Sequence, residues 1–141
     1  MLILDTALIT ILFRGAAPER ISLVSWLDAS NDRDAYVTII SFEEQMRGWL
    51  AFIARATGPE QQSDGYTRLG ELLSNFGEIP VLPFDVRAAR YFEGLRRKYR
   101  RHGAADLKIA TIAITNDATL LTRNIRDFRG VDELSVVNPL A

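Results

Sequence analysis

The chain contains no cysteine and only one histidine, His102. Without cysteine it can form neither disulfide bonds nor thiolate metal sites, and it has no cysteine nucleophile. With a single histidine it cannot build a site that needs two or more imidazoles from one chain. These absences remove thiol catalysis and multi-histidine metal centres from the candidate functions.

Long apolar runs and an excess of charge of one sign are also missing. No stretch of about 18 apolar residues occurs, and the apolar start of the chain carries Asp5 and lacks the basic region of a signal peptide. We therefore expect a cytoplasmic protein that does not span a membrane. The formal net charge is −1, so any binding to nucleic acid requires a local basic patch.

The 141 residues are predicted to form one domain, 1–141, with its own core. Short apolar runs alternate with helical patterns. Strands are expected at 2–4, 36–40, 79–84 (an edge strand, because of its prolines), 118–122 and 134–137. Helices are expected at 7–13, 24–30, 42–56, 66–76, 86–103 and 107–114, with a loop or a helix-to-helix turn at 57–65. Asp85 is expected to cap the helix that Gly103 ends. The alternation predicts an α/β fold with a five-stranded parallel sheet and helices on both faces.

Polar residues follow several of the predicted strands. Asp5 comes directly after the first strand, Glu44 lies in the first turn of the helix after the second, and Asp106 opens the last buried helix. The fourth strand is followed by a polar cluster of Thr122, Asn124 and Asp127. Ligands of parallel sheets bind beyond the carboxyl ends of the strands, so we expect these groups to reach one edge of the sheet.

Each acid by itself also has a structural explanation, since acids are enriched at helix N-termini. Ser41 to Glu44 matches a capping box, Asp5 and Asp106 can cap their helices, and Asp127 can begin a turn. Together the acids favour a divalent metal site, because Mg²⁺ and Mn²⁺ prefer hard oxygen ligands and can activate water against a phosphodiester. Glycoside hydrolysis by paired carboxylates is disfavoured, because few aromatic residues lie near the acids to stack a sugar.

Four segments of the chain match a known family. They are "LILDTALITILFRG" with Asp5, "TIISFEEQMRGW" with Glu44, "GAADLKIATIAI" with Asp106, and "ATLLTRNIRDFRGV" with Asn124 and Asp127. In these segments and their order the chain resembles PIN-domain ribonucleases, most closely the VapC toxins of type II toxin–antitoxin pairs. The resemblance implies a three-layer α/β/α sandwich with a five-stranded parallel sheet. It also implies Mg²⁺- or Mn²⁺-dependent cleavage of RNA (tRNA, rRNA or mRNA), a homodimer, and a cognate antitoxin whose C-terminal segment lies in a groove and blocks the site.

The resemblance also assigns the acids their roles. Asp5, Glu44 and Asp106 match the family's three core acids and are expected to hold the metal. Many relatives carry an acid where this chain has Asn124. Asp127 either supplies the missing carboxylate or begins the next turn.

Residues beside the acids are expected to support them. Thr6 and Thr122 are in position to make hydrogen bonds to the carboxylates. Glu43 and Glu44 are neighbours on a helix and therefore about 100° apart, so only one of them should face the site, and the resemblance favours Glu44. Ala7 stands where many relatives have asparagine, so one polar contact of the family is missing here.

Arginines flank the acids on both sides in sequence. The segment before Asp106 holds Arg97, Arg100 and Arg101, and the segment after the fourth strand holds Arg123 and Arg126. These residues either contact RNA phosphates or form solvated helix faces and pairs with nearby acids.

Three other interpretations of the sequence are weighed. A PIN-domain nuclease of RNA processing without an antitoxin has the same residues, and an adjacent antitoxin gene would separate the two. The Asn124 replacement is also compatible with a catalytically inactive PIN-fold module that binds a partner. A phospho-receiver domain is disfavoured, because Asp5 stands alone where such domains have an acidic pair and no lysine follows the last strand.

Overall fold

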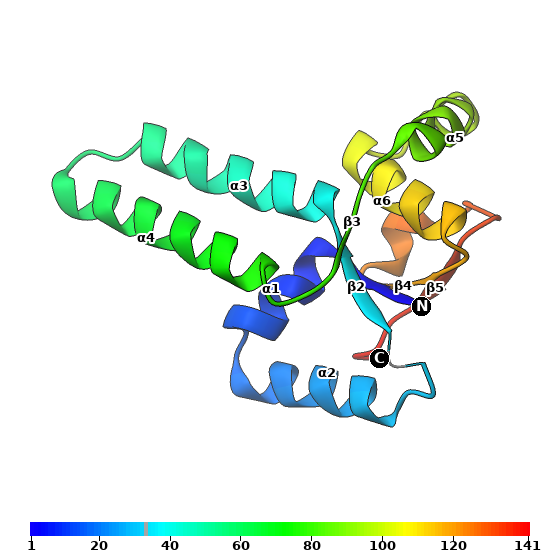
Figure 1. Cartoon of the computed structure of the whole chain (residues 1–141), viewed down its shortest axis with the longest axis horizontal. Coiled ribbons are helices and arrows are strands. Elements are labelled where there is room, and N and C mark those ends of the chain that lie inside the picture. Colours follow the sequence, from blue (N-terminus) through cyan, green and yellow to red (C-terminus); the bar gives the residue numbers. More distant parts are fainter. Residues whose placement is uncertain (33) are drawn as a thin grey trace.

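The computed structural model describes residues 1–32 and 34–141, which form a five-stranded sheet between two layers of helices (Figure 1). The strand order is β3-β2-β1-β4-β5, and all neighbouring strands are parallel. The strands are β1 (Leu2–Leu4), β2 (Ala35–Thr38), β3 (Val81–Leu82), β4 (Thr119–Leu121) and β5 (Ser135–Val137). The helices are α1 (Thr6–Arg14), α2 (Ala17–Ala29), α3 (Ile39–Ala54), α4 (Pro59–Phe76), α5 (Val86–Lys98), α6 (Ala104–Thr115) and the short 3₁₀ helix η1 (Ile125–Phe128). The predicted α/β/α sandwich is confirmed.

The two faces of the sheet carry separate halves of the core. Successive side chains of a strand point to opposite faces, so Leu2 and Leu4 of β1 join one hydrophobic cluster and Ile3 joins another. Apolar residues of α1, α2 and α4 complete the first cluster, and apolar residues of α6 complete the second. The central strand β1 is therefore buried on both faces, which fixes the position of Asp5 directly after it.

The helices α3 and α4 form a hairpin that extends away from the sheet (Figure 1). The sequence predicted a loop at 57–65, but α4 already begins at Pro59. Gly58 is the N-cap, and proline is tolerated in the first turn because its missing N–H has no partner there in any helix. The alternative prediction, a helix-to-helix turn, is confirmed, but the turn is shorter than predicted, because most of these turn-forming residues start a helix.

The close packing of this hairpin depends on Gly65. A Cβ atom added to Gly65 would lie 2.5 Å from Ile53 Cγ1 and 3.1 Å from Phe52 Cδ1. We therefore expect Gly65→Ala to lower the free energy of unfolding by about 1–3 kcal/mol, the usual cost of overpacking. Gly70→Ala is the matched control in the same helix, because a Cβ there meets no atom within 4 Å and is expected to stabilise by about 0.5–1 kcal/mol. Urea unfolding checks both values, and equal stabilities of the two variants would contradict this packing.

The boundary between β2 and α3 differs from the prediction. Thr38 is the N-cap of α3, because its hydroxyl accepts a hydrogen bond from the Ser41 N–H at 3.2 Å. Ile39 and Ile40 are therefore the first residues of the helix and not the end of the strand, although β-branched residues favour strands. The capping-box interpretation of Ser41 is also wrong, since Ser41 lies inside the first turn.

The boundary between α5 and α6 also differs. Asp85 caps α5 as predicted, accepting a hydrogen bond from the Ala88 N–H at 2.9 Å. The helix ends at Lys98, however, and Gly103 is the N-cap of α6 rather than the end of α5. Tyr99 leaves the helical conformation, and its side chain bonds to a distant loop, which local sequence patterns do not predict.

Two further elements are found but with other lengths. The helix predicted at 24–30 runs over Ala17–Ala29, because Pro18 sits in its first turn, where proline is tolerated. The strand predicted at 79–84 is an edge strand as expected, but only Val81–Leu82 pair with β2. No helix in the described ranges is long and apolar enough to cross a membrane.

Candidate functional site

Asp5 lies at the carboxyl end of β1 and is the N-cap of α1. One carboxylate oxygen accepts a hydrogen bond from the Leu8 N–H at 2.9 Å, and the other accepts one from the Thr122 hydroxyl. The residue is only 7% exposed. Each carboxylate oxygen has two lone-pair directions, so both keep capacity for a further ligand. Asp5 is therefore held in place by the fold while it can still bind a cation.

Glu44 is held from the neighbouring helix α3. The Thr6 hydroxyl lies 2.7 Å from Glu44 Oε1, to which it donates, and 2.9 Å from the Ser41 hydroxyl. Glu43 instead accepts a hydrogen bond from Arg47 at 2.7 Å, in an exposed ion pair on the same helix. The structure therefore directs Glu44, and not Glu43, toward Asp5.

Asp106 and Asp127 complete a group of four carboxylates. Asp106 lies in the first turn of α6, and Asp127 lies in η1 after β4. Burial raises the pKa of Asp106, and the negative charges of Asp127, Glu44 and Asp5 raise it further. A positive charge on His102 would lower the pKa of Asp106. Four acids from four separate segments thus lie close enough together for their charges to interact.

The pKa of Asp5 is shifted in the same direction. Burial raises it, and the hydrogen bonds from Thr122 and Leu8 offset part of that effect. The charges of Glu44 and Asp127 raise it as well. A cation among the acids would remove this repulsion, because an opposite charge favours the ionised form of a carboxyl.

The donor set fits a hydrated divalent cation. In the described part of the chain, no three histidine or acidic side chains converge as a preformed metal cage. Charge effects reach farther than coordination distances, which is why Glu44 and Asp127 raise the pKa of Asp5 and Asp106 without the acids converging. Mg²⁺ usually keeps several waters and is bound through one or two carboxylates, so a group of carboxylates that lie near one another without forming a cage matches it.

The remaining predicted residues divide into two groups. Arg101 and Arg126 line the same hollow as Asp106 and Asp127, together with Arg129, which sequence reasoning missed. We call this space of about 370 Å³ the rim hollow. After β4 an arginine occurs at every third position, and this spacing was the available signal for Arg129.

Other predicted residues lie outside the rim hollow. Arg97 and Arg100 line an adjacent hollow with Arg96. Arg123 is paired with Glu19 of α2 at 3.2 Å, one of the two outcomes predicted for it. Asn124 is exposed, and its backbone N–H donates to the Thr122 hydroxyl at 3.0 Å.

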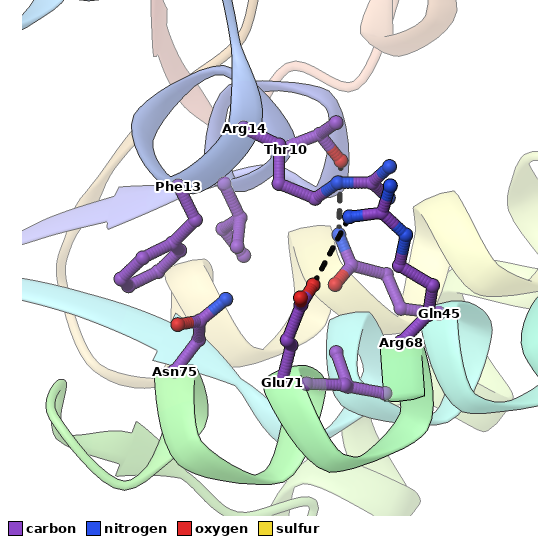
Figure 2. A pocket seen from close by; sticks show the side chains of 9 residues that line it. Thr10, Phe13, Arg14, Gln45, Arg68, Glu71 and Asn75 are labelled. Atoms are coloured by element: carbon purple, nitrogen blue, oxygen red, sulfur yellow. Dashed lines mark hydrogen bonds and ion pairs between the residues drawn. The ribbon is translucent and has the colours of Figure 1, made fainter. Parts of the chain in front are cut away.

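A second concave region lies between α1, α3 and α4 (Figure 2). Ile9, Phe13 and Leu72 form its apolar part. Its polar lining consists of Thr10, Arg14, Gln45, Arg68, Glu71 and Asn75. Its open part has a volume of about 410 Å³. We call this region the α1–α4 groove.

The α1–α4 groove is connected to the acids by hydrogen bonds. The Gln45 side-chain amide donates to the Thr10 hydroxyl at 3.0 Å (Figure 2), and that hydroxyl donates to the Thr6 carbonyl at 3.2 Å. Thr6 in turn binds Glu44, which neighbours Gln45 in α3. The groove therefore ends beside the acidic site. Sequence reasoning missed Gln45, for which no local signal exists.

Comparison with known proteins gives a consistent assignment. The family model "PIN domain" matches residues 2–134. The chain is 31% identical to a ribonuclease VapC of Rickettsia bellii over 96% of its own length and 94% of the relative's. The structure superposes on FitAcB of Neisseria gonorrhoeae with a TM-score of 0.68 and 30% identity, covering 99% and 98% of the two chains. It shares its fold with VapBC2 of Rickettsia felis, solved with a DNA fragment from the promoter, with a TM-score of 0.69, 20% identity and 97% coverage of each chain. The chain therefore belongs to the PIN-domain family and, within it, is related to the VapC proteins.

Proposed function

We propose that this protein is a Mg²⁺- or Mn²⁺-dependent endoribonuclease and the toxin of a type II toxin–antitoxin pair. The observation that carries the proposal is the grouping of Asp5, Glu44, Asp106 and Asp127, from four separate segments, at the carboxyl edge of a PIN-domain sheet. Partly buried carboxylates that repel one another form a site for a divalent cation. The name of the relative from R. bellii, a ribonuclease, supports RNA as the substrate.

The chain's own residues would divide the work as follows. Asp5, Glu44 and Asp106 would hold the cation, and Thr6 and Thr122 would keep two of these carboxylates oriented through their hydrogen bonds. A bound divalent cation supplies an activated water and offsets the negative charge that develops on a phosphodiester. The fixed carboxylates lower the cost of forming this site, because little reorganisation is needed.

Asp127 is the fourth acidic residue in this proposal. Its charge acts on both Asp5 and Asp106. Asn124 carries no charge and would accept a hydrogen bond from a water of the cation. The missing acid at Asn124 is therefore replaced in function by Asp127, three residues later in the chain.

Arginines would bring the RNA to these acids. Arg101 and Arg126 line the rim hollow beside Asp106, and Arg97 and Arg100 continue the basic surface along the end of α5. Contacts of this kind bind the phosphate backbone without reading sequence and weaken with salt. Arg123 is engaged with Glu19, but its exposed ion pair is weak enough to be exchanged for a phosphate.

The α1–α4 groove is proposed as the place where the antitoxin binds. Apolar side chains line its inner part and charged groups its rim, which suits an amphipathic peptide segment. Because Thr10 and Gln45 of the groove are bonded to the Thr6 that holds Glu44, a segment lying there would end at the acids and block them. The neighbour from R. felis was solved as a VapBC2 complex on promoter DNA, which supports a partner of this kind.

The test combines cleavage of RNA with growth on induced expression. Purified protein should cleave total RNA with Mg²⁺ or Mn²⁺ and not with EDTA, and its expression should arrest growth. Cleavage without arrest would favour the RNA-processing nuclease. The absence of both, in a folded protein whose melting temperature does not respond to metal, would leave an inactive binding module.

We expect a small gene adjacent to this one to encode the antitoxin, and the second arm of the experiment uses such a gene. Co-expression of that gene should relieve the arrest, and Phe13→Asp should keep the arrest but lose the relief, because a charge replaces the apolar lining of the groove. Relief that survives Phe13→Asp would place the antitoxin elsewhere. The homodimer stays a prediction, which the mass of the purified protein in solution tests.

A further inference from the structure

The rim hollow contains more positive charge than the acids beside it require. Arg101, Arg126 and Arg129 line it together with Asp106 and Asp127. None of these three arginines belongs to an ion pair among the residues that the structure describes. Its volume of about 370 Å³ falls in the range of small-ligand sites, which is about 300–1,000 Å³. An anion of nucleotide size is the chemistry that three free guanidinium groups would bind.

The N-terminus of α6 opens on the same space. Gly103, the N-cap of this 12-residue helix, lines the hollow and has no side chain that could cap the helix. The free N–H groups and positive dipole end of such a helix favour an anion. The backbone N–H groups of α6 thus add a second group of hydrogen-bond donors to the arginines.

The backbone around Arg129 is fixed by contacts with the end of α5. His102 Nε2 lies 3.0 Å from the Arg129 carbonyl, and because a carbonyl only accepts, Nε2 carries the proton. The Tyr99 hydroxyl accepts a hydrogen bond from the Asp132 N–H at 3.2 Å, and Lys98 binds Glu133 at 2.8 Å. The arginine is therefore presented from an anchored loop, so the hollow is a preformed space.

His102 also has a side-chain nitrogen without a hydrogen-bond partner in the part of the chain that the structure describes. Its Nδ1 is buried and, among the described residues, is the one such side-chain atom without a hydrogen-bond partner. The ring lies edge-on against Tyr99 and lines the hollow. The imidazole is thus held in one orientation and reports directly on what occupies the space.

We propose that the rim hollow is a second phosphate subsite, in which Arg101, Arg126 and Arg129 hold the phosphate next to the scissile one in the RNA chain. The inference rests on the proposed function for the identity of the chain as RNA. Asp106 and Asp127 form the boundary between the two subsites, because they line the hollow and also belong to the acidic group. The protein should therefore require at least two consecutive phosphates for efficient cleavage.

A binding measurement tests the subsite without any cleavage. The chain has one histidine, so the untagged protein gives a single imidazole signal in its proton NMR spectrum. Titration with adenosine 5′-monophosphate in EDTA, at fixed pH, should shift the His102 signal, and adenosine should not. Arg126→Ala and Arg129→Ala should each raise the titration midpoint about tenfold, as expected for one lost charge-assisted contact. Arg90→Ala, an exposed arginine two turns before the end of α5, is the matched control and should leave the midpoint unchanged.

Kinetics on RNA supply the second readout. Arg126→Ala and Arg129→Ala should raise KM about tenfold and leave kcat nearly unchanged, because the lost contact is to a neighbouring phosphate that does not react and so binds equally in the ground state and the transition state. A His102 signal that does not respond to adenosine 5′-monophosphate, or responds equally in the arginine variants, would overturn the subsite even if RNA is cleaved. If the response depends on the arginines but the protein cleaves no RNA, the anion site would be supported and the proposed nuclease activity contradicted.

Discussion

Asp5→Asn is expected to abolish RNA cleavage while it stabilises the metal-free protein. The loss should exceed the 10- to 100-fold effect that is typical of changing a residue behind a metal ligand, because Asp5 is proposed as a ligand itself. The fold should tolerate the change, since asparagine caps helices about as well as aspartate and can still accept the hydrogen bond from the Leu8 N–H. Activity and stability should therefore move in opposite directions.

The sign of the stability effect follows from the raised pKa of Asp5. A carboxyl whose pKa is higher in the folded protein than in the unfolded chain holds its proton more tightly when folded. Stability then falls as the pH rises from the unfolded value, about 3.9, through the folded one, and the full cost persists at neutral pH. Asparagine carries no charge and removes this cost, so we expect a gain of about 0.5–1 kcal/mol at pH 7.

Thermal unfolding and cleavage assays on the same preparations check this prediction. Without metal, Asp5→Asn should melt about 2–4 °C above the wild type at pH 7. Added Mg²⁺ should raise the melting temperature of the wild type and have little effect on the variant, because a ligand stabilises only the state that binds it. Asp64→Asn, an exposed aspartate of α4, is the matched control and should change neither property. Cleavage that survives Asp5→Asn would remove Asp5 from the site, and a variant that is both inactive and less stable would reduce its role to capping α1.

Thr122→Val is expected to shift the pH dependence of cleavage toward higher pH. Thr122 is fully buried, and its hydroxyl donates to Asp5 while it accepts from the Asn124 N–H. The bond to Asp5 lowers the pKa of that carboxyl, so its removal lets the pKa rise further. A hydrogen bond to a charged group contributes about 1.5–3 kcal/mol, so losing it should raise the pKa of Asp5 enough to be measured.

The direction of the activity change follows from the need for an ionised ligand. A carboxyl binds a metal only after it loses its proton, so cleavage rises with pH through the pKa of Asp5. In Thr122→Val the acidic limb of the kcat/KM profile should therefore move to higher pH. Stability should also fall by about 1–3 kcal/mol, because the Asn124 N–H and an Asp5 oxygen lose a buried partner.

Thr122→Ser provides the control, because it keeps the hydroxyl and removes only a methyl group. Its pH profile should coincide with that of the wild type, while that of Thr122→Val shifts. Identical profiles for the valine and serine variants would mean that the hydroxyl does not tune Asp5. Profiles measured at saturating Mg²⁺ and at several metal concentrations separate the pKa effect from a loss of metal affinity.

The sequence by itself determined the fold class and the region of the site. Asp5, Glu44 and Asp106 follow the ends of strands or begin helices, and parallel strands bring such positions to one edge. Helix caps formed within a few residues, such as Asp85 on α5, could also be predicted, because both partners lie in one stretch of sequence. The predicted boundaries of elements were wrong where a local preference competed with another contact. Ile39 and Ile40, for example, favour a strand but are helical because Thr38 caps α3.

Only the tertiary structure decided which side chains act together. It separated Glu44 from Glu43 through a hydrogen bond to Thr6, 38 positions away in the chain. It placed the Thr122 hydroxyl on Asp5 across 117 positions. It also placed Asp127 among the acids and Arg129 in the rim hollow. The physical reason is that such pairs are set by strand order and helix packing rather than by short-range periodicity, so a single sequence records the residues but not their distances.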